Sequence, residues 1–351
     1  MEKRIMAGTD YEVSRIGIGG HYRAMEEGEF ENRYAYVDQE IEHRTILTKK
    51  AVDHGITYFD TTWRNEADLL GKALDSLHFR DKVHVNGMVL GAFRGSEATG
   101  LEVEEYFDRW LDKRLATFSG NRFDSIMINA IEENYSEKKC ERLIKLLEKR
   151  KAEGDFKIYG FSCHDPFHAR KVADTFPEFK IIMIPYNYKN RRFEEAFQGY
   201  QRDASFIAMK PLVWAEYGIP FCAVNRLENF EQHLGFSPSE DAAAKAIKFI
   251  KQNPFITTAL CSVNSLEELD ILISAGEGSY TSEDEITLYN YNTIHTPEKI
   301  VYLYISALLY DNLRMNFFGA ANLSRLLNIA MPHIPLNESN SHQRINCFGV
   351  R

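Results

Sequence analysis

Short runs rich in Val, Ile and Phe alternate along this chain with longer stretches whose apolar residues recur every three or four positions. Such alternation is typical of strand–helix units around a parallel sheet. Strands are predicted at 15–19, 57–60, 83–88, 125–129, 157–161, 181–185, 206–210 and 257–262. Helices are predicted at 39–53, 66–76, 101–117, 136–153, 164–175, 192–200, 238–251 and 265–275. Eight consecutive pairs predict an α/β fold of the (β/α)8 TIM barrel type.

The remaining segments suggest how the chain is organised around this barrel. The barrel is predicted to span 1–276, with residues 1–14 forming an N-terminal hairpin that closes its bottom. The aromatic-rich segment 277–351 predicts a helical C-terminal extension. The predicted loop 20–38 is much longer than the roughly 2–6 residues usual after a barrel strand, which marks it as a candidate part of a functional site.

Composition excludes several classes of protein. The net charge is −9 and no basic cluster forms one face, so a nucleic-acid partner is not expected. The apolar runs are shorter than the roughly 20 residues of a membrane span and no apolar leader opens the chain, so a cytoplasmic protein without a membrane partner is expected. The five cysteines are scattered without a C-x-x-C pair, which favours reduced thiols over disulfides or a bound metal.

Asp60 ends the segment Gly-Ile-Thr-Tyr-Phe-Asp-Thr-Thr at 55–62, which follows the glycine-rich opening 8–19 and precedes Leu-Leu-Gly-Lys-Ala-Leu at 69–74. This order of motifs resembles the aldo/keto reductases, barrel enzymes that reduce carbonyls with NADPH. The motifs at 160–165 and 208–212 are similar to a branch of that family with a C-terminal iron–sulfur extension, although its cluster cysteines are absent here. In the family this Asp belongs to a proton-relay tetrad with a Tyr, a Lys and a His.

The comparison with the family pattern finds only the Asp of that tetrad. Asn65 stands where the family places its acid Tyr, and Met88 replaces the Lys that lowers the pKa of that Tyr. The fourth strand ends in Asn129 rather than His. Asn129 can orient a carbonyl by hydrogen bonding, but an amide cannot transfer a proton near neutral pH.

The cofactor contacts implied by the resemblance are also depleted. Of the Ser, Asn and Gln that hold the nicotinamide in the family, Ser162 is kept, while Met183 replaces the Gln. Between Lys251 and Lys299 the sequence has no Lys or Arg that could meet the 2′-phosphate of NADPH. We therefore expect no redox cofactor, with NADPH as the alternative.

In a TIM barrel the reacting groups come from the carboxyl ends of the strands and the loops that follow. The predicted acid–base residues are Asp60, Lys210, His164 and His21. The predicted substrate contacts are Tyr22, Trp63, Asn86, Met88, Asn129, Ser162, Tyr186 and Trp214. Asp60 could instead pair with Arg64, Lys210 could be an interior lysine paired with Asp60 or Glu66, and His164 could simply begin a helix. No spacing motif indicates a metal site.

The leading hypothesis from the sequence is a lyase, cyclase or isomerase that acts on a carbonyl-bearing small molecule by acid–base catalysis without a redox cofactor. One alternative is an NADP-dependent oxidoreductase with an altered site. Another is a catalytically inactive barrel that serves as a binding or regulatory subunit, which a pocket filled by Met88, Met183 and Trp63 would favour. The sequence does not indicate an oligomeric state.

Overall fold

The computed structural model describes residues 1–20, 38–62, 64–118, 122–132, 135–212 and 240–294. Contacts divide the chain into one unit of Met1–Val224 with Ser239–Leu288 and a second of Asn225–Pro238 with Tyr289–Arg351. Of the second unit only residues 289–294 are described, and of the predicted C-terminal extension 277–351 only residues 277–294. Within the described ranges, no helix is both long and apolar enough to cross a membrane.

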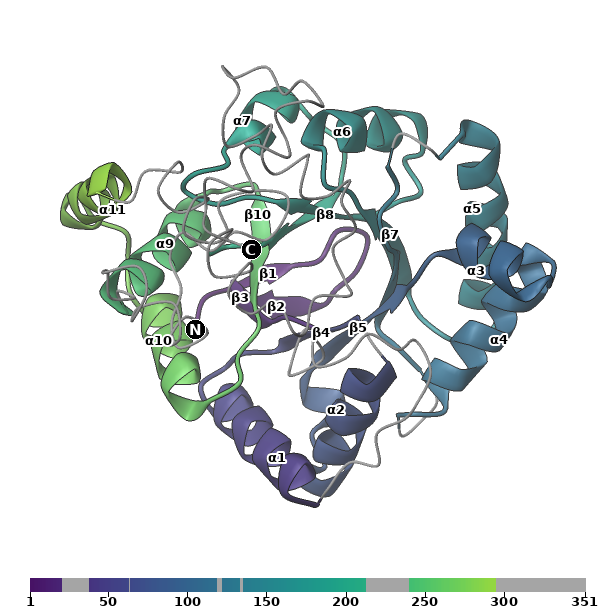
Figure 1. The fold of residues 1–351 in the computed structure, drawn as a ribbon, viewed down its shortest axis with the longest axis horizontal. Coiled ribbons are helices and arrows are strands. Elements are labelled where there is room, and N and C mark those ends of the chain that lie inside the picture. The colour runs from purple at the N-terminus through teal and green to yellow at the C-terminus, as the bar shows by residue number, and fades with distance from the viewer. Residues whose placement is uncertain (21–37, 63, 119–121, 133–134, 213–239, 295–351) are drawn as a thin grey trace, which may run out of the picture. The chain divides into compact units, whose positions relative to one another are not determined.

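The first unit contains a closed barrel of eight parallel strands (Figure 1). Around the barrel these are β3 (Ile16–Ile18), β4 (Tyr58–Thr61), β5 (His84–Val89), β6 (Ser125–Ile128), β7 (Ile158–Ser162), β8 (Ile181–Pro185), β9 (Ser205–Met209) and β10 (Ile256–Cys261). The barrel closes where β10 pairs with β3, through Ala259 opposite Ile16. The predicted (β/α)8 barrel is therefore confirmed.

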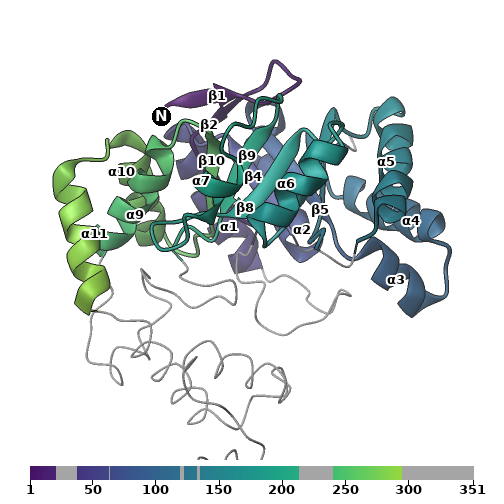
Figure 2. The same cartoon turned by 90° about the horizontal axis from the view of Figure 1, so that it is seen from above.

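Helices surround the barrel, and a two-stranded hairpin lies across one end (Figure 2). The helices are α1 (Asp38–Asp53), α2 (Arg64–Leu77), α3 (Ala92–Thr99), α4 (Val103–Leu115), α5 (Glu137–Ala152), α6 (Pro166–Thr175), α7 (Arg192–Ala196), α9 (Glu240–Gln252), α10 (Leu266–Glu277) and α11 (Ser282–Ile294). The hairpin pairs β1 (Lys3–Ile5) with β2 (Glu12–Ser14), as predicted from the sequence. The helix α3 was not predicted, whereas α11 lies within the segment 277–351, for which a helical extension was predicted.

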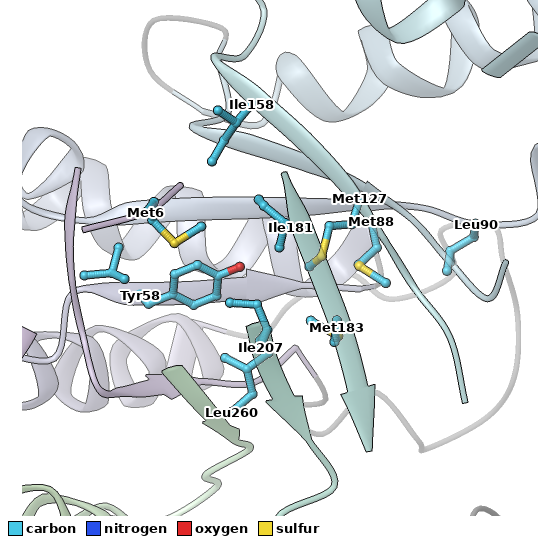
Figure 3. Close-up of a cluster of buried hydrophobic side chains, with 11 residues drawn as sticks. Met6, Tyr58, Met88, Leu90, Met127, Ile158, Ile181, Met183, Ile207 and Leu260 are labelled. Carbon is cyan, nitrogen blue, oxygen red and sulfur yellow. The ribbon is translucent and has the colours of Figure 1, made fainter. Parts of the chain in front are cut away.

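The barrel interior is filled by apolar side chains from successive strands and from the hairpin (Figure 3). The cluster consists of Met6, Val13, Tyr58, Met88, Leu90, Met127, Ile158, Ile181, Met183, Ile207 and Leu260. Because neighbouring residues of a strand point to opposite sides, every second residue faces this core. Met88, predicted to contact substrate, is only 3% exposed and packs within the cluster.

A buried ion pair joins the amino ends of β5 and β6. Arg80, in the short helix η1 (Arg80–Lys82), donates from Nη1 to Asp124 Oδ2 at 2.8 Å and from Nη2 to the carbonyl of Arg122 at 2.9 Å. Asp124 Oδ2 also accepts from the Val85 N–H at 2.8 Å. Both partners are buried, so this pair fixes two adjacent strands at the end of the barrel opposite their carboxyl ends.

Candidate functional site

Asp60 lies on β4, directly opposite Asn86 of β5 in the sheet register, and is 4% exposed. Asn86 Nδ2 donates to Oδ1 at 2.6 Å, and Thr62 Oγ1 donates to Oδ2 at 3.3 Å. The backbone N–H of Gly20 is a third donor. A Cβ at Gly20 would lie 2.8 Å from Asp60 Oδ2 and 2.6 Å from Thr62 N, so only glycine lets the chain approach the carboxylate this closely.

Burial and hydrogen bonding act in opposite directions on the Asp60 carboxyl. Burial raises its pKa from the ordinary 3.8 to about 6, although Asn86, Thr62 and Gly20 favour the charged form and Arg114 adds a favourable electrostatic effect. The carboxylate is therefore ionised at neutral pH at a cost in folding free energy. Such a perturbed carboxyl at the carboxyl end of a barrel strand is a frequent feature of functional sites.

A chain of hydrogen bonds continues from Asp60 through the barrel interior. Ser125 Oγ donates to Asn86 Oδ1 at 2.7 Å, and His84 Nε2 lies 2.8 Å from Ser125 Oγ. Burial lowers the pKa of His84 to about 4, so its imidazole is neutral and stacks on Tyr58 with ring centroids 5.0 Å apart. The Ser125 hydroxyl donates its proton to Asn86, so His84 must donate from Nε2 to Ser125 Oγ. The hydrogen bonds therefore all run in one direction, from His84 through Ser125 and Asn86 to the Asp60 carboxylate. Asn86, predicted to contact substrate, is thus an interior partner of Asp60 and is fully buried.

The loops after β6 and β7 are held together side by side. Ser162 Oγ accepts from the Ala130 N–H at 2.9 Å and lies 3.4 Å from Asn129 Oδ1, to which it donates. The Ile131 N–H donates to the Ser162 carbonyl at 2.8 Å. Asn129, predicted to contact substrate, is only partly buried. Ala130 has a φ of 55°, a left-handed conformation that is unfavourable for a residue with a side chain.

The next residue of this loop, Glu132, binds His164 twice. Its Oε1 accepts from the His164 backbone N–H at 2.9 Å and lies 2.8 Å from the ring Nδ1. The thiol of Cys163 is 3.5 Å from Oε2. Burial alone would raise the pKa of the Glu132 carboxyl, but the hydrogen bonds from His164 outweigh that effect and lower it, so Glu132 is ionised at neutral pH. The sequence prediction of His164 as an acid–base residue omitted this partner.

His164 does not begin the following helix. The N-cap of α6 is Asp165, whose side chain accepts from the Phe167 N–H, and Pro166 occupies the first helical position. Asp165 also pairs with Arg192 at 3.2 Å. The imidazole of His164 is consequently available for another role, with its side chain 29% exposed.

Lys210 stands at a strand end, as the sequence indicates, but not beside Asp60. Lys210 directly follows β9 with a φ of 57°, and its carbonyl accepts from Asn187 Nδ2 at 3.0 Å. Among the described residues, the donors to Asp60 do not include Lys210, so the alternative of an Asp60–Lys210 ion pair is not found.

Tyr186 was predicted to line the substrate pocket, yet it lies in the helical layer. Its hydroxyl lies 2.6 Å from Glu194 Oε1, to which it donates, and accepts from Asn253 Nδ2 at 3.0 Å, while its ring lies against Phe249. The physical reason is strand alternation: Met183 faces the core, so a residue three positions later faces outward. His21, Tyr22, Trp63 and Trp214 lie outside the described residues.

The helix after the last strand begins with its own polar cap. Ser265 is the N-cap of α10 and accepts from the Glu268 N–H, while Glu268 Oε2 accepts from the Asn264 N–H at 2.6 Å. Glu267 adds a second acidic side chain in the same turn. This end of α10 is therefore acidic and already capped.

Solved structures with a similar fold are aldo/keto reductases. One from Klebsiella pneumoniae, in complex with NADP and acetate, is 18% identical, with a TM-score of 0.60 over 83% of this chain and 95% of that chain. Another from Klebsiella pneumoniae, in complex with NADPH, is 17% identical, with a TM-score of 0.58 over 83% of this chain and 95% of that chain. An apo form from Bacillus halodurans is 17% identical, with a TM-score of 0.56 over 83% and 96%. A search of curated proteins finds no match.

The sequence model of the aldo/keto reductase family matches residues 22–214 of the 351 in the chain. This family and the complexes with NADP and NADPH contradict the expectation that no redox cofactor is used. That expectation was wrong because it equated a few replaced contact residues with loss of the whole binding site. Neither the fold nor the similar structures support a lyase, cyclase or isomerase. The chain belongs to the aldo/keto reductase family.

Proposed function

We propose that this protein is an NADP-dependent oxidoreductase that reduces a carbonyl group of a small molecule. The observation that carries the proposal is the family match over residues 22–214, a range that contains six of the eight barrel strands, β4 to β9. Site geometry supports it, because polar groups of β4, β6 and β7 lie at the strand ends where barrel enzymes bind their ligands.

The described residues fit the nicotinamide end of the cofactor. A carboxamide needs both a donor and an acceptor, and the Asn129 amide and Ser162 hydroxyl stand side by side at the ends of β6 and β7. When bound, NADPH supplies a hydride to a carbonyl carbon. The first turn of α10 does not supply a charge-assisted phosphate contact, because Glu267 and Glu268 occupy it.

The other described groups shape the site around this chemistry. Met88 and Met183 are 3% and 4% exposed and belong to the apolar cluster that fills the barrel interior. Asp60 fixes the end of β4 and the approach of Gly20 through its three hydrogen bonds. Asn129 is placed to orient a carbonyl oxygen by donating a hydrogen bond from its amide.

NADPH at a hundred times its dissociation constant is expected to stabilise the folded protein by about 2.7 kcal/mol, because a ligand that binds only the folded state shifts the folding equilibrium. Thermal melts with and without NADPH would show this as a higher midpoint, and nucleotide fluorescence would give the dissociation constant. If millimolar NADPH changed neither signal, the proposed function would be wrong.

A matched pair of serine variants locates the nicotinamide contact. Ser162→Ala is expected to weaken NADPH binding by about tenfold, the scale of one lost hydrogen bond. Ser205 is the control, because its hydroxyl also accepts from a backbone N–H, that of Ala7 at 2.8 Å, but at the opposite end of the barrel. Ser205→Ala should leave the affinity for NADPH unchanged. Equal affinities in the two variants would remove Ser162 from the site.

A further inference from the structure

Reduction of a carbonyl to an alcohol adds a hydride to carbon and a proton to oxygen, so the site needs a proton donor. Most ionisable groups described near the strand ends are unsuited to this task. Both oxygens of Asp60 accept hydrogen bonds in a buried setting, and burial raises the pKa of the Cys163 thiol. The Tyr186 hydroxyl is held by Glu194 in the helical layer. His164 differs from all three in being partly exposed.

We propose that His164, held by Glu132, is the proton donor of this site, an inference that rests on the proposed reductase function. Glu132 is an ionised acceptor, so the ring nitrogen that faces it, Nδ1, carries a proton. Nε2 is then the atom that gains and loses the exchangeable proton. Because the same carboxylate oxygen also binds the His164 backbone N–H, the ring and the main chain are positioned together.

The backbone next to this dyad is shaped to hold it. Ala130 adopts a left-handed conformation that costs about 1–2 kcal/mol, and it is maintained by hydrogen bonds to Ser162 on the neighbouring strand. Glu132 lies in the loop that follows β6, which ends at Ile128. It meets His164, which lies two residues after the end of β7. The distorted loop thus brings a carboxylate from one strand end to the imidazole of the next.

The step balances without a further reagent. The carbonyl carbon gains the hydride that NADPH supplies, the carbonyl oxygen gains the proton from Nε2 of the His164 imidazolium, and the carbon–oxygen π bond breaks. The imidazole then regains a proton from water. Glu132 remains ionised throughout and stabilises the imidazolium as a positioning residue, without contacting the substrate.

Kinetics with NADPH and para-nitrobenzaldehyde or phenanthrenequinone as probes test the assignment. His164→Gln is expected to lower kcat by about 10²–10⁴-fold, the contribution of a general acid, with the NADPH dissociation constant unchanged. His54 offers a matched control, because it lies 3.8 Å from Glu277 as an exposed histidine–carboxylate pair on the outer surface. His54→Gln should keep the kcat of the wild type.

A second readout does not depend on turnover. NMR of isotope-labelled imidazole nitrogens should show neutral His164 with its proton on Nδ1, and Glu132→Ala should shift that proton toward Nε2. A wild-type proton on Nε2, or a His164→Gln variant that binds NADPH and keeps wild-type kcat, would overturn the proton-donor assignment alone. A wild type that does not bind NADPH, or reduces neither probe, would count against the reductase function as well.

Discussion

Arg80→Met is expected to lower the free energy of unfolding by about 3–5 kcal/mol, because removal of one member of a buried ion pair leaves the other charge without a partner. The group left without a partner would be Asp124, whose Oδ2 accepts from Arg80 Nη1 at 2.8 Å and from the Val85 N–H. In the variant, only the hydrogen bond from Val85 would remain of these two. The lost contact from Arg80 to the Arg122 carbonyl adds to the effect. Urea denaturation followed by circular dichroism measures the change.

Arg122 provides the control for this prediction. It pairs with Asp81 at the same distance of 2.8 Å, but the side chains are 41% and 89% exposed. Arg122→Met should therefore change the free energy of unfolding by no more than about 1 kcal/mol. The double variant Arg80→Met with Asp124→Asn should recover part of the loss, because no charge remains buried. Equal effects of the two single variants would show that burial does not govern the Arg80 pair.

Asp60→Asn is expected to change how stability depends on pH. Burial raises the folded-state pKa of Asp60 from 3.8 to about 6, so the folded protein binds more protons than the unfolded chain between these values. The stability contributed by the neutral carboxyl is fully present below the unfolded pKa and is lost as pH rises through the folded pKa. Relative to the Asn variant, the wild type should lose about 2–3 kcal/mol between about pH 4 and pH 7.

This pH-dependent difference is more informative than stability at one pH. The amide oxygen of an asparagine at position 60 could still accept a hydrogen bond from Asn86. Its NH2 group would then face another donor, such as the Thr62 hydroxyl, and the free-energy cost of that contact does not vary with pH. Asp203 is exposed and serves as the control, since Asp203→Asn should not reproduce the dependence. Parallel stability curves for the wild type and Asp60→Asn would contradict the assigned burial cost.

The sequence predicts the barrel well because strand and helix periodicities are local properties of the chain. Each predicted strand overlaps an observed one. The strand-end rule selected Asp60 and His164 as candidates, and their roles stay a prediction. The rule missed Glu132 because it was applied only as far as Asn129, whereas Glu132 lies further along the loop after β6, beyond the left-handed Ala130. The same rule applied to Glu132, three positions beyond Asn129, would have made it a candidate.

Other errors have physical causes of their own. Tyr186 was assigned to the substrate pocket although strand alternation argues against that place. Met183 faces the core, so Tyr186, three residues later, faces the helices. The alternative of an Asp60–Lys210 ion pair is not found because the two residues belong to strands that are not neighbours. Asp60 lies on β4 and Lys210 follows β9, and β3 and β10 stand between these strands in the barrel. The cofactor expectation failed because dinucleotide binding is distributed over many contacts, so that loss of a few does not establish loss of binding.

Transfer of a labelled hydride tests the reductase function most directly. NADPH deuterated at the transferable position of the nicotinamide ring would be incubated with the full chain and para-nitrobenzaldehyde, and the alcohol product analysed by mass spectrometry. We expect the product to carry the deuterium on its former carbonyl carbon, with one NADPH consumed for each alcohol formed. An unlabelled product, or no product from protein that is folded and saturated with NADPH, would contradict the assignment of this barrel as an NADP-dependent carbonyl reductase.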